Sequence, residues 1–376
     1  MAANASRQAA WLRGLALAGA LAAGVLVVYA PLLLTNRVQG AGDAFTYFTP
    51  YRDYINTSLR AGRLPLWNPY LFMGVPFLAN PQTAVFYPLH WPFIFLTAAK
   101  SLQASLALHL WLTSLGAAVY ARRVARLGWL AALVTGLVWS LSGYLGARAG
   151  QVNQISVAAW LPWLLTLLEQ STPRWRLGHA APTAPRVHGL AWAGLSAAIA
   201  LQLLAGHSQS SFIVLTGLLL AALWPGLAAL LVVAMQRVRR QRLSLDRAAL
   251  GAALGRSALV LTAVLLAVLL AALQLLPTLE LSGLSIRSGG LSLREAVAFS
   301  LQPRGLLLTF LPSYGENLAE RFATPAFGEY VGYVGVSALL LAAWGAVQGR
   351  KAGLASVWGL AVALGGVGVA FALGAY

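Results

Sequence analysis

The twenty residues Leu15–Leu34, LALAGALAAGVLVVYAPLLL, contain no charged side chain. A bilayer core about 30 Å thick needs roughly 20 apolar residues per helix, so this stretch is long enough to cross a membrane. It follows Arg7 and Arg13, as the apolar region of a signal peptide would, but it is too long for one and lacks a clear small-residue cleavage site after it. We therefore expect an uncleaved membrane anchor.

Runs of this kind recur along the whole chain of 376 residues, of which 59% are hydrophobic and 9% charged. That apolar content exceeds what a soluble core of this length buries. Hydropathy predicts helices near residues 12–35, 101–121, 127–147, 154–170, 189–206, 210–235, 257–279, 328–348 and 354–374. The sequence therefore predicts an all-α, polytopic transmembrane bundle of about nine helices, forming one module over residues 1–376.

The charges divide the connections between these helices into two sets. A formal net charge of +17 would indicate nucleic-acid binding in a soluble protein, but here the cations lie between apolar segments, where they set topology or meet anionic lipid. With a cytoplasmic N-terminus, 16 of the 26 cations fall on the inner side, including the run from Arg237 to Arg256, and seven of the nine acids fall outside. We expect a multi-pass protein with the lipid bilayer, and no nucleic acid, as its partner.

Two outer segments are long enough to fold, residues 36–100 and 280–327. Residues 43–95 hold seven of the 17 prolines and 14 aromatic residues. Proline fixes φ and aromatic rings prefer the headgroup layer, so residues 64–70 and 86–92 are predicted to be ordered turns against the membrane. The chain has no cysteine, which excludes disulfides and thiolate metal sites.

Ahead of these turns, Thr49 and Pro50 read as an N-cap and a proline at the first helical position, and apolar residues recur at helical spacing until Gly62. This predicts an amphipathic surface helix. Its polar face is expected to carry Asp53, Asn56, Thr57 and Arg60. Asp53 lies in the first turn, where the helix dipole favours a carboxylate, so we prefer a structural role for it.

Asp43 follows the first predicted span, at the end of the run GAGD of residues 40–43, and no local pairing explains it. It can cap the turn into Phe45 or serve a function. Because a carboxylate at a membrane-facing pocket is costly without a purpose, we prefer the functional interpretation.

Several motifs occur in a fixed order. GDAF at 42–45 is followed by PYR at 50–52, AGRLPLWNPY at 61–70, GVPF at 74–77 and FYP at 86–88, then by GHSQ at 206–209, LLPTLE at 275–280, SIR at 285–287 and EYVGYVG at 329–335. Together they resemble the bacterial YfhO-like membrane protein family, with Ser208 replacing the proline of that family's Gly-His-Pro-Gln motif. Members are usually longer, with further helices and an extracytoplasmic C-terminal domain, so we expect the chain to continue beyond Tyr376.

That family is similar to GT-C glycosyltransferases, which pass a sugar from a polyprenyl-phosphate carrier to an acceptor outside the cytoplasm. The resemblance implies a GT-C-like fold in a bacterial plasma membrane and an inverting reaction on a cell-envelope glycan, lipid or protein. It also implies Asp43 as general base, with Asp53 in reserve. Such a reaction must deprotonate an acceptor hydroxyl and neutralise a phosphate.

Polar residues near the outer ends of the predicted helices are the candidates for binding substrate. Arginine suits a phosphate because its guanidinium binds in a bidentate way, although an interfacial anchor explains each arginine as well. His207 can bind sugar, phosphate or a divalent ion, or cap its turn. The candidates are Arg52, His90, Arg148, Gln151, Asn153, Gln154, His207, Gln209, Glu280, Arg287, Glu316 and Glu329. We interpret Glu169, Asp246, Glu295 and Glu320 as solvated or helix-end charges.

The sequence implies no organic cofactor and contains no metal-binding motif, and it leaves the need for a divalent cation open. A transporter or flippase of lipid-linked intermediates, or a non-catalytic scaffold for envelope assembly, fits the helices too. Transporters place substrate groups near the bilayer midplane, whereas most predicted helices here carry almost no charge in mid-span. This favours chemistry at the outer interface, and it predicts that Asp43, His207 and Arg287 line one cavity.

Overall fold

The computed structural model is mostly helical, with a single pair of two-residue strands among the described residues. It describes residues 2–39, 42–172, 188–242, 244–286, 288–298, 300–303, 306, 331–351 and 355–374. Of the predicted site residues, Arg287, Glu316 and Glu329 lie outside these ranges.

The α-helices are α1 (Ala2–Leu33), α2 (Thr49–Arg60), α3 (Ala98–Arg123), α4 (Trp129–Ser140), α5 (Gly143–Ala147), α6 (Val152–Ala158), α7 (Leu161–Ser171), α8 (Gly189–Leu204), α9 (Ser208–Val238), α10 (Arg247–Leu270), α11 (Ala272–Gly283), α12 (Leu293–Ala296), α15 (Val336–Lys351) and α16 (Ala355–Leu373). The π-helix η1 (Ala44–Phe48) leads into α2, and η2 (Pro81–Thr83) and η3 (Pro88–Phe93) are short 3-10 helices. Strand β1 (Trp67–Asn68) pairs antiparallel with β2 (Val75–Pro76).

Five helical segments in the described part of the chain are long and apolar enough to cross a membrane, by length and composition. They are Arg7–Leu33 of α1, α3, the stretch Trp129–Ala147 of α4 and α5, α9 and α10. Helix α8 and parts of α15 and α16 are apolar but shorter. The prediction of an all-α membrane bundle is confirmed at this level, while nine spans and the GT-C fold stay predictions.

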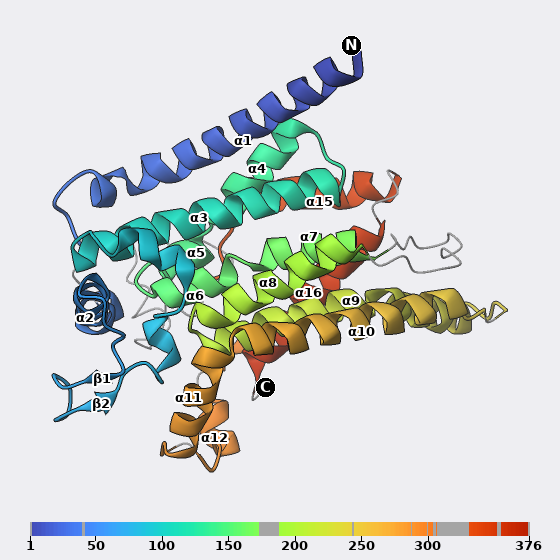
Figure 1. Ribbon diagram of the computed structural model, residues 1–376. Coiled ribbons are helices and arrows are strands. Elements are labelled where there is room, and N and C mark those ends of the chain that lie inside the picture. The colour runs from blue at the N-terminus through green and yellow to red at the C-terminus, as the bar shows by residue number, and fades with distance from the viewer. Residues whose placement is uncertain are drawn as a thin grey trace.

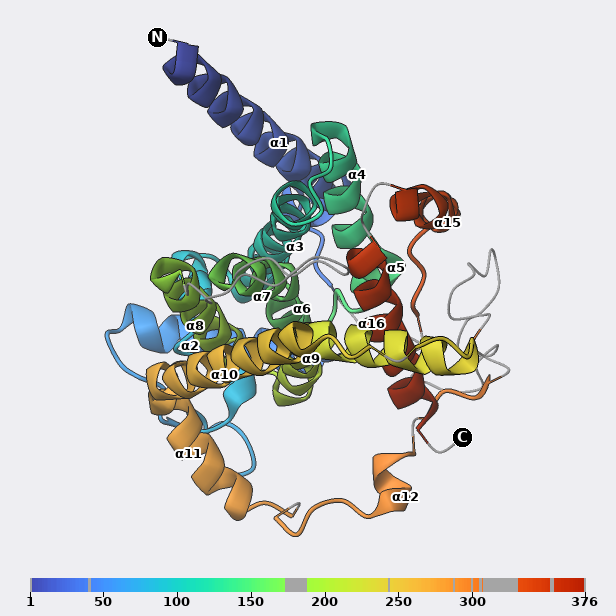
Figure 2. The same cartoon turned by 90° about the vertical axis from the view of Figure 1, so that its right-hand side faces the viewer.

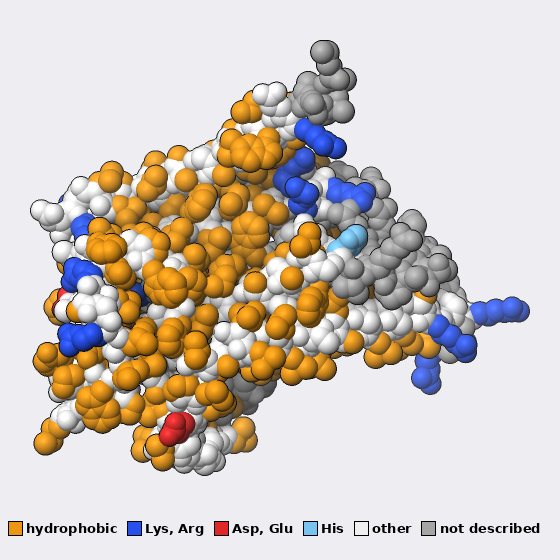
Figure 3. Space-filling model, viewed as in Figure 1, with side chains coloured by type: hydrophobic (Ala, Val, Ile, Leu, Met, Phe, Trp, Pro, Cys, Tyr) orange, Lys and Arg blue, Asp and Glu red, His pale blue; other side chains and the backbone are white. Residues whose placement is uncertain are grey.

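The long helices run between two ends of the molecule (Figure 1). We call the end that carries α2, β1 and β2 the loop end. At the opposite end α1 begins and α9 turns into α10, and basic side chains gather there (Figure 3). Arg7, Arg13, Arg237, Arg239 and Arg240 are all exposed, so we call it the arginine end.

Helices α7, α8, α9 and α10 enclose the largest apolar core, with Leu164, Leu195, Ile199 and Leu218 fully buried. A second cluster joins α1, α3 and α4 around Leu21, and α3 packs against both α4 and α7. Figure 2, turned by 90°, shows the N-terminal part of α1 reaching away from the other helices and α11 with α12 at the edge of the bundle. The core thus supports the turn from α8 into α9 at the loop end, while α9 turns into α10 at the arginine end.

The predicted helix at 257–279 is wrong at both ends. The Asp246 carboxylate accepts the N–H of Ala249 at 3.0 Å and caps α10, which starts at Arg247. The helix then ends at Leu270, and the chain turns into α11 at Ala271 (Figure 1). Arg256 is thus not part of an inner connection but lies buried within α10.

The surface helix predicted after Thr49 is α2, with two corrections. Thr49 is not its N-cap, because η1 runs directly into α2, and Asp53 consequently lies beyond the first turn. The dipole argument for Asp53 therefore fails. Asn56, expected on the exposed polar face, is 1% exposed, because the buried face of α2 also carries Arg52 and packs on α3.

Candidate functional site

Asp43 lies at the loop end, exposed to solvent, directly before η1. Gly42, with φ +60°, turns the chain into η1, and its carbonyl oxygen accepts the N–H groups of Phe45 and Thr46. Gln151 Nε2 donates a hydrogen bond to Asp43 Oδ2 at 3.4 Å, across 108 residues of sequence. The carboxylate is therefore held beside the connection between α5 and α6.

That connection and the start of α6 carry two further predicted residues. Arg148 is half-buried, with its guanidinium 4.1 Å from the centre of the Tyr144 ring, and its carbonyl oxygen accepts the N–H of Gln151. Asn153 is buried and its Nδ2 donates to the carbonyl oxygen of Gly206 at 3.5 Å. The α5–α6 connection thus links Asp43 to the turn between α8 and α9.

His207 occupies this turn and is the N-cap of α9, where its Nδ1 accepts the N–H of Ser210 at 3.1 Å. The structure therefore shows the capping role that the sequence offered as one alternative for His207. Burial, and then the positive charge of Arg148, lower the pKa of His207. Because Nδ1 accepts, the neutral ring carries its proton on Nε2, which is the nitrogen available to a ligand.

Gly206 brings the loop of residues 42–97 onto the same turn. Its φ is +85°, and a Cβ at this position would lie 2.1 Å from the carbonyl oxygen of Pro81. Only glycine allows this approach. Three connections therefore meet here, and we call Asp43, Arg148, Gln151, Asn153 and His207 the Asp43 cluster.

Arg52 and His90 form a separate pair. Arg52 is 6% exposed, and its Nη2 donates to His90 Nδ1 at 2.9 Å. Burial lowers the pKa of Arg52 to about 10, and burial together with the charge of Arg52 lowers the pKa of His90. Arg52 is therefore not the interfacial anchor considered from sequence, since a snorkelling side chain would place its guanidinium in water.

Sequence reasoning missed the groups next to this pair. Tyr87 Oη donates to His109 Nε2 at 2.8 Å and accepts the indole N–H of Trp160 at 3.1 Å. His109 Nδ1 donates to the carbonyl oxygen of Ser105 at 2.6 Å. His109, the one histidine of the apolar helix α3, was the available signal, but its partner Tyr87 lies in the loop of residues 42–97 and Trp160, which bonds Tyr87, lies just before α7.

The remaining candidates do not join either group through a described side-chain contact. Asp53 is exposed on α2, Gln209 is exposed in the first turn of α9, and Glu280 is exposed on α11. Gln154 is half-buried and touches the Asp43 cluster only through its backbone N–H, which donates to Asn153 Oδ1. The sequence predicted that Asp43, His207 and Arg287 line one cavity. Asp43 and His207 both belong to the Asp43 cluster, and Arg287 lies outside the described residues.

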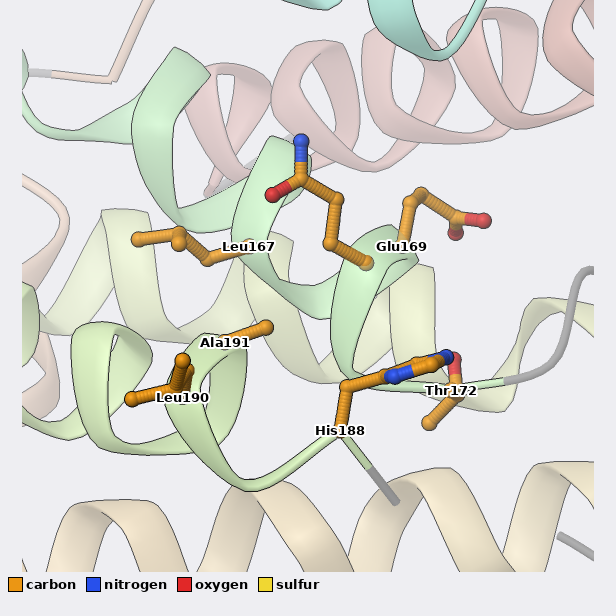
Figure 4. Close-up of a pocket in the computed structure, with 7 residues that line it drawn as sticks. Leu167, Glu169, Thr172, His188, Leu190 and Ala191 are labelled. Atoms are coloured by element: carbon orange, nitrogen blue, oxygen red, sulfur yellow. The ribbon is translucent and has the colours of Figure 1, made fainter. Parts of the chain in front are cut away.

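A cavity of about 650 Å³ lies between α7 and α8, away from the Asp43 cluster. Leu167 and Glu169 of α7 and Leu190 and Ala191 of α8 line it, with His188 beside Thr172 and the Glu169 carboxylate pointing away from Leu190 (Figure 4). Glu169 was predicted to be a solvated or helix-end charge; it lies in the last turn of α7, but it is not solvated freely, because its carboxylate pairs with buried Arg256. None of the predicted catalytic or substrate-binding residues that the structure describes lines this cavity.

The Asp43 cluster combines an exposed carboxylate, a guanidinium, two amides and a neutral imidazole. A carboxylate can take a proton from a hydroxyl group, and an arginine can offset the charge of a leaving phosphate. Within the described residues no three His, Asp or Glu side chains gather as a metal ion requires. No protein family model, curated protein or solved structure matches this chain.

Proposed function

We propose that the chain is a membrane glycosyltransferase that moves a sugar from a polyprenyl-phosphate carrier to a cell-envelope acceptor. The observation that supports it best is the Asp43 cluster, in which an exposed carboxylate accepts a hydrogen bond from Gln151 beside Arg148 and His207. The motif resemblance to YfhO-like proteins supports the same activity. A GT-C fold in a bacterial plasma membrane, with the loop end outside the cytoplasm, belongs to this proposal.

In the proposed reaction, Asp43 takes the proton of the acceptor hydroxyl as its oxygen attacks the anomeric carbon. The bond from that carbon to the phosphate oxygen breaks, and the carrier phosphate leaves with the electron pair. Attack opposite to the leaving group inverts the anomeric configuration. Arg148 offsets the charge of the phosphate, and His207 Nε2 donates a hydrogen bond to sugar or phosphate.

A second candidate is transport of lipid-linked intermediates. It is favoured by polar groups within the helices, namely His109 in α3 and the pair of Arg256 with Glu169, since ionisable groups inside spans often mark transport routes. A structural role accounts for most of their polar atoms, because His109 uses both ring nitrogens and Arg256 bonds three partners through its two terminal nitrogens. Among the described residues only the buried Nε of Arg256 lacks a partner within this group. We therefore rank transport second.

The test is sugar transfer in proteoliposomes by the full chain, with a radiolabelled polyprenyl-phosphate sugar. Asp43→Asn should reduce transfer by about 100-fold or more, as expected for removal of a general base. Asp53→Asn is the matched control, since it removes an exposed carboxylate at the same end, and should leave transfer within about twofold.

A large loss in Asp53→Asn alone would move the base to Asp53. Full transfer by both variants would exclude a mechanism in which either aspartate is the general base. If the wild type flips lipid but transfers no sugar, the transport function would be favoured over the glycosyltransferase function.

A further inference from the structure

The hairpin of β1 and β2 presents large apolar side chains to the outside. Tyr70 is 81% exposed, Phe72 91% and Met73 102%, and we call these three residues the apolar tip. Figure 1 shows the hairpin projecting from the loop end. Three neighbouring apolar side chains with this exposure form a patch that soluble surfaces normally avoid.

The apolar tip has a defined backbone conformation that hydrogen bonds close. Phe72 and Met73 both have positive φ, 46° and 65°, in the left-handed region that disfavours residues with a Cβ. The turn is closed by Asn68 Oδ1, which accepts the N–H of Tyr70 at 2.9 Å, and by a bond from the N–H of Gly74 to the carbonyl oxygen of Leu71 at 2.7 Å. Backbone strain held in place by bonds around it is a mark of function.

The base of the hairpin is fixed to α2 and to its own turn. Tyr54 Oη donates to the carbonyl oxygen of Trp67 at 2.6 Å, and its ring lies 5.9 Å from that of Tyr70. The Trp67 indole fills the space beside Gly74, where a Cβ would lie 2.5 Å from Nε1. The tip therefore keeps a defined direction relative to α2.

Two exposed arginines, Arg60 and Arg63, precede the hairpin in the sequence. They are the only Lys, Arg, Asp or Glu residues between positions 54 and 97, and the exposed carboxylate of Asp53 comes just before Tyr54. Exposed aromatic and methionine side chains next to arginines match the apolar and anionic layers of a lipid leaflet.

The segment behind the hairpin is bonded to α11, a helix with an exposed apolar side. Gln274 and Thr278 of α11 donate to the carbonyl oxygens of Leu78 and Ala79, close behind β2. On its exposed side α11 carries Leu273, Leu276 and Leu279, each at least 66% exposed. Helix α11 follows the candidate span α10 directly, so the base of the hairpin is tied to a segment that adjoins a candidate span.

We propose that the apolar tip inserts into the leaflet at the loop end and that Arg60 and Arg63 bind anionic headgroups there. The hairpin then fixes α2, and the loop of residues 42–97, at a set depth in the membrane. This anchoring does not depend on the proposed glycosyltransferase activity.

The absence of cysteine allows a clean test with the full chain. Phe72→Cys carries an environment-sensitive fluorophore, and the protein is reconstituted in phosphatidylcholine vesicles with or without phosphatidylglycerol. We expect blue-shifted emission, strong quenching by nitroxide lipids and several-fold weaker quenching by aqueous iodide than for Thr57→Cys, an exposed control on α2. Met73→Cys should repeat the result if Phe72→Cys reduces the yield of folded protein.

In the wild-type background, we expect the fluorophore at position 72 to be more deeply buried in vesicles with phosphatidylglycerol than in vesicles without it. Replacing both Arg60 and Arg63 by Gln should abolish this difference. Equal iodide quenching at positions 72, 73 and 57 would overturn the proposal. So would a blue-shifted label that nitroxide lipids do not quench, because the tip would then be covered by protein.

Discussion

Loss of the Glu169 carboxylate should destabilise the protein strongly, because it leaves a buried guanidinium without its counter-charge. The Arg256 side chain is 5% exposed and that of Glu169 21%. Arg256 also donates to Thr172 Oγ1 at 3.0 Å and to the carbonyl oxygen of Ala221 at 3.3 Å. One side chain of α10 thereby joins α7 and α9.

Glu169→Ala should lower the free energy of unfolding by about 3–5 kcal/mol, the usual effect of removing one partner from a buried ion pair. Glu169→Gln keeps an oxygen acceptor and should lower it by about 1–3 kcal/mol. The double variant Glu169→Leu with Arg256→Met removes both charges and should recover to within about 2 kcal/mol of the wild type, because apolar replacements of buried pairs are often neutral.

The assay is reversible unfolding of the purified full chain in mixed micelles, followed by circular dichroism. Glu280→Ala is the control, since it removes an exposed carboxylate from α11 and should change the free energy of unfolding by less than about 0.5 kcal/mol. The reasoning would be refuted if the free energy of unfolding of Glu169→Ala lay within about 1 kcal/mol of the wild-type value. It would also be refuted if the double variant were less stable than Glu169→Leu alone and Arg256→Met alone.

Two further predictions concern the turn between α8 and α9. Gly206→Ala should lower the free energy of unfolding by roughly 2–5 kcal/mol, from a positive φ and a clash with the Pro81 carbonyl oxygen; Gly146→Ala, with open space around it, is the control, and equal stability of the two variants would show that the close approach is absent. The lowered pKa of His207 means that the unfolded chain binds its proton more readily. Stability from this residue is therefore complete above about pH 6.5 and is lost as pH falls toward the lower folded pKa, where protonated Nδ1 also stops accepting the N–H of Ser210. Denaturation between about pH 5 and 8 should show a steeper acid loss for the wild type than for His207→Gln, and identical pH profiles would contradict this.

Hydropathy located the long helices well, because an uncharged run is a local property of the chain. The range predicted at 101–121 corresponds to α3, Ala98–Arg123, and that at 210–235 to α9, Ser208–Val238. The break at Ala271 was not predictable in this way, since the residues on both sides are equally apolar. Its position depends on contacts of α11 with the distant carbonyl oxygens of Leu78 and Ala79.

Charges gave a less reliable prediction than apolar runs. Arg256 was assigned to a connection because it follows other arginines closely, yet the Asp246 cap starts α10 before it. Its partner Glu169 is 87 residues away, and no spacing rule joins the two. Helical periodicity similarly placed Asn56 on the exposed face, whereas packing of α2 against α3 buries it.

For the candidate site, the sequence predicted residue types at one end of the bundle, and the structure groups five of them. Asp43, Arg148, Gln151, Asn153 and His207 come from connections that meet through Gly206 and Pro81. Asp43 and His207 stand in the quoted motifs, and Arg148, Gln151 and Asn153 were chosen as polar residues near the outer ends of predicted helices. That they meet was not predictable residue by residue, because no local pattern shows that residues 81 and 206 touch. The role of Asp43 as a base stays a prediction.

The Arg52–His90 pair gives a physical reason why Asp43 keeps its position. Because η1 and α2 follow each other without a break from Ala44 to Arg60, the rotation of α2 about its axis also sets the direction in which Asp43 leaves η1. Apolar packing alone would tolerate small rotations of α2, whereas a buried guanidinium loses its hydrogen bond to His90 Nδ1 when the helix turns. The buried charge costs stability, and what it supplies in return is a single orientation of α2. We therefore expect that a change which breaks the Arg52–His90 bond, although it lies away from the Asp43 cluster, also displaces Asp43 from Gln151.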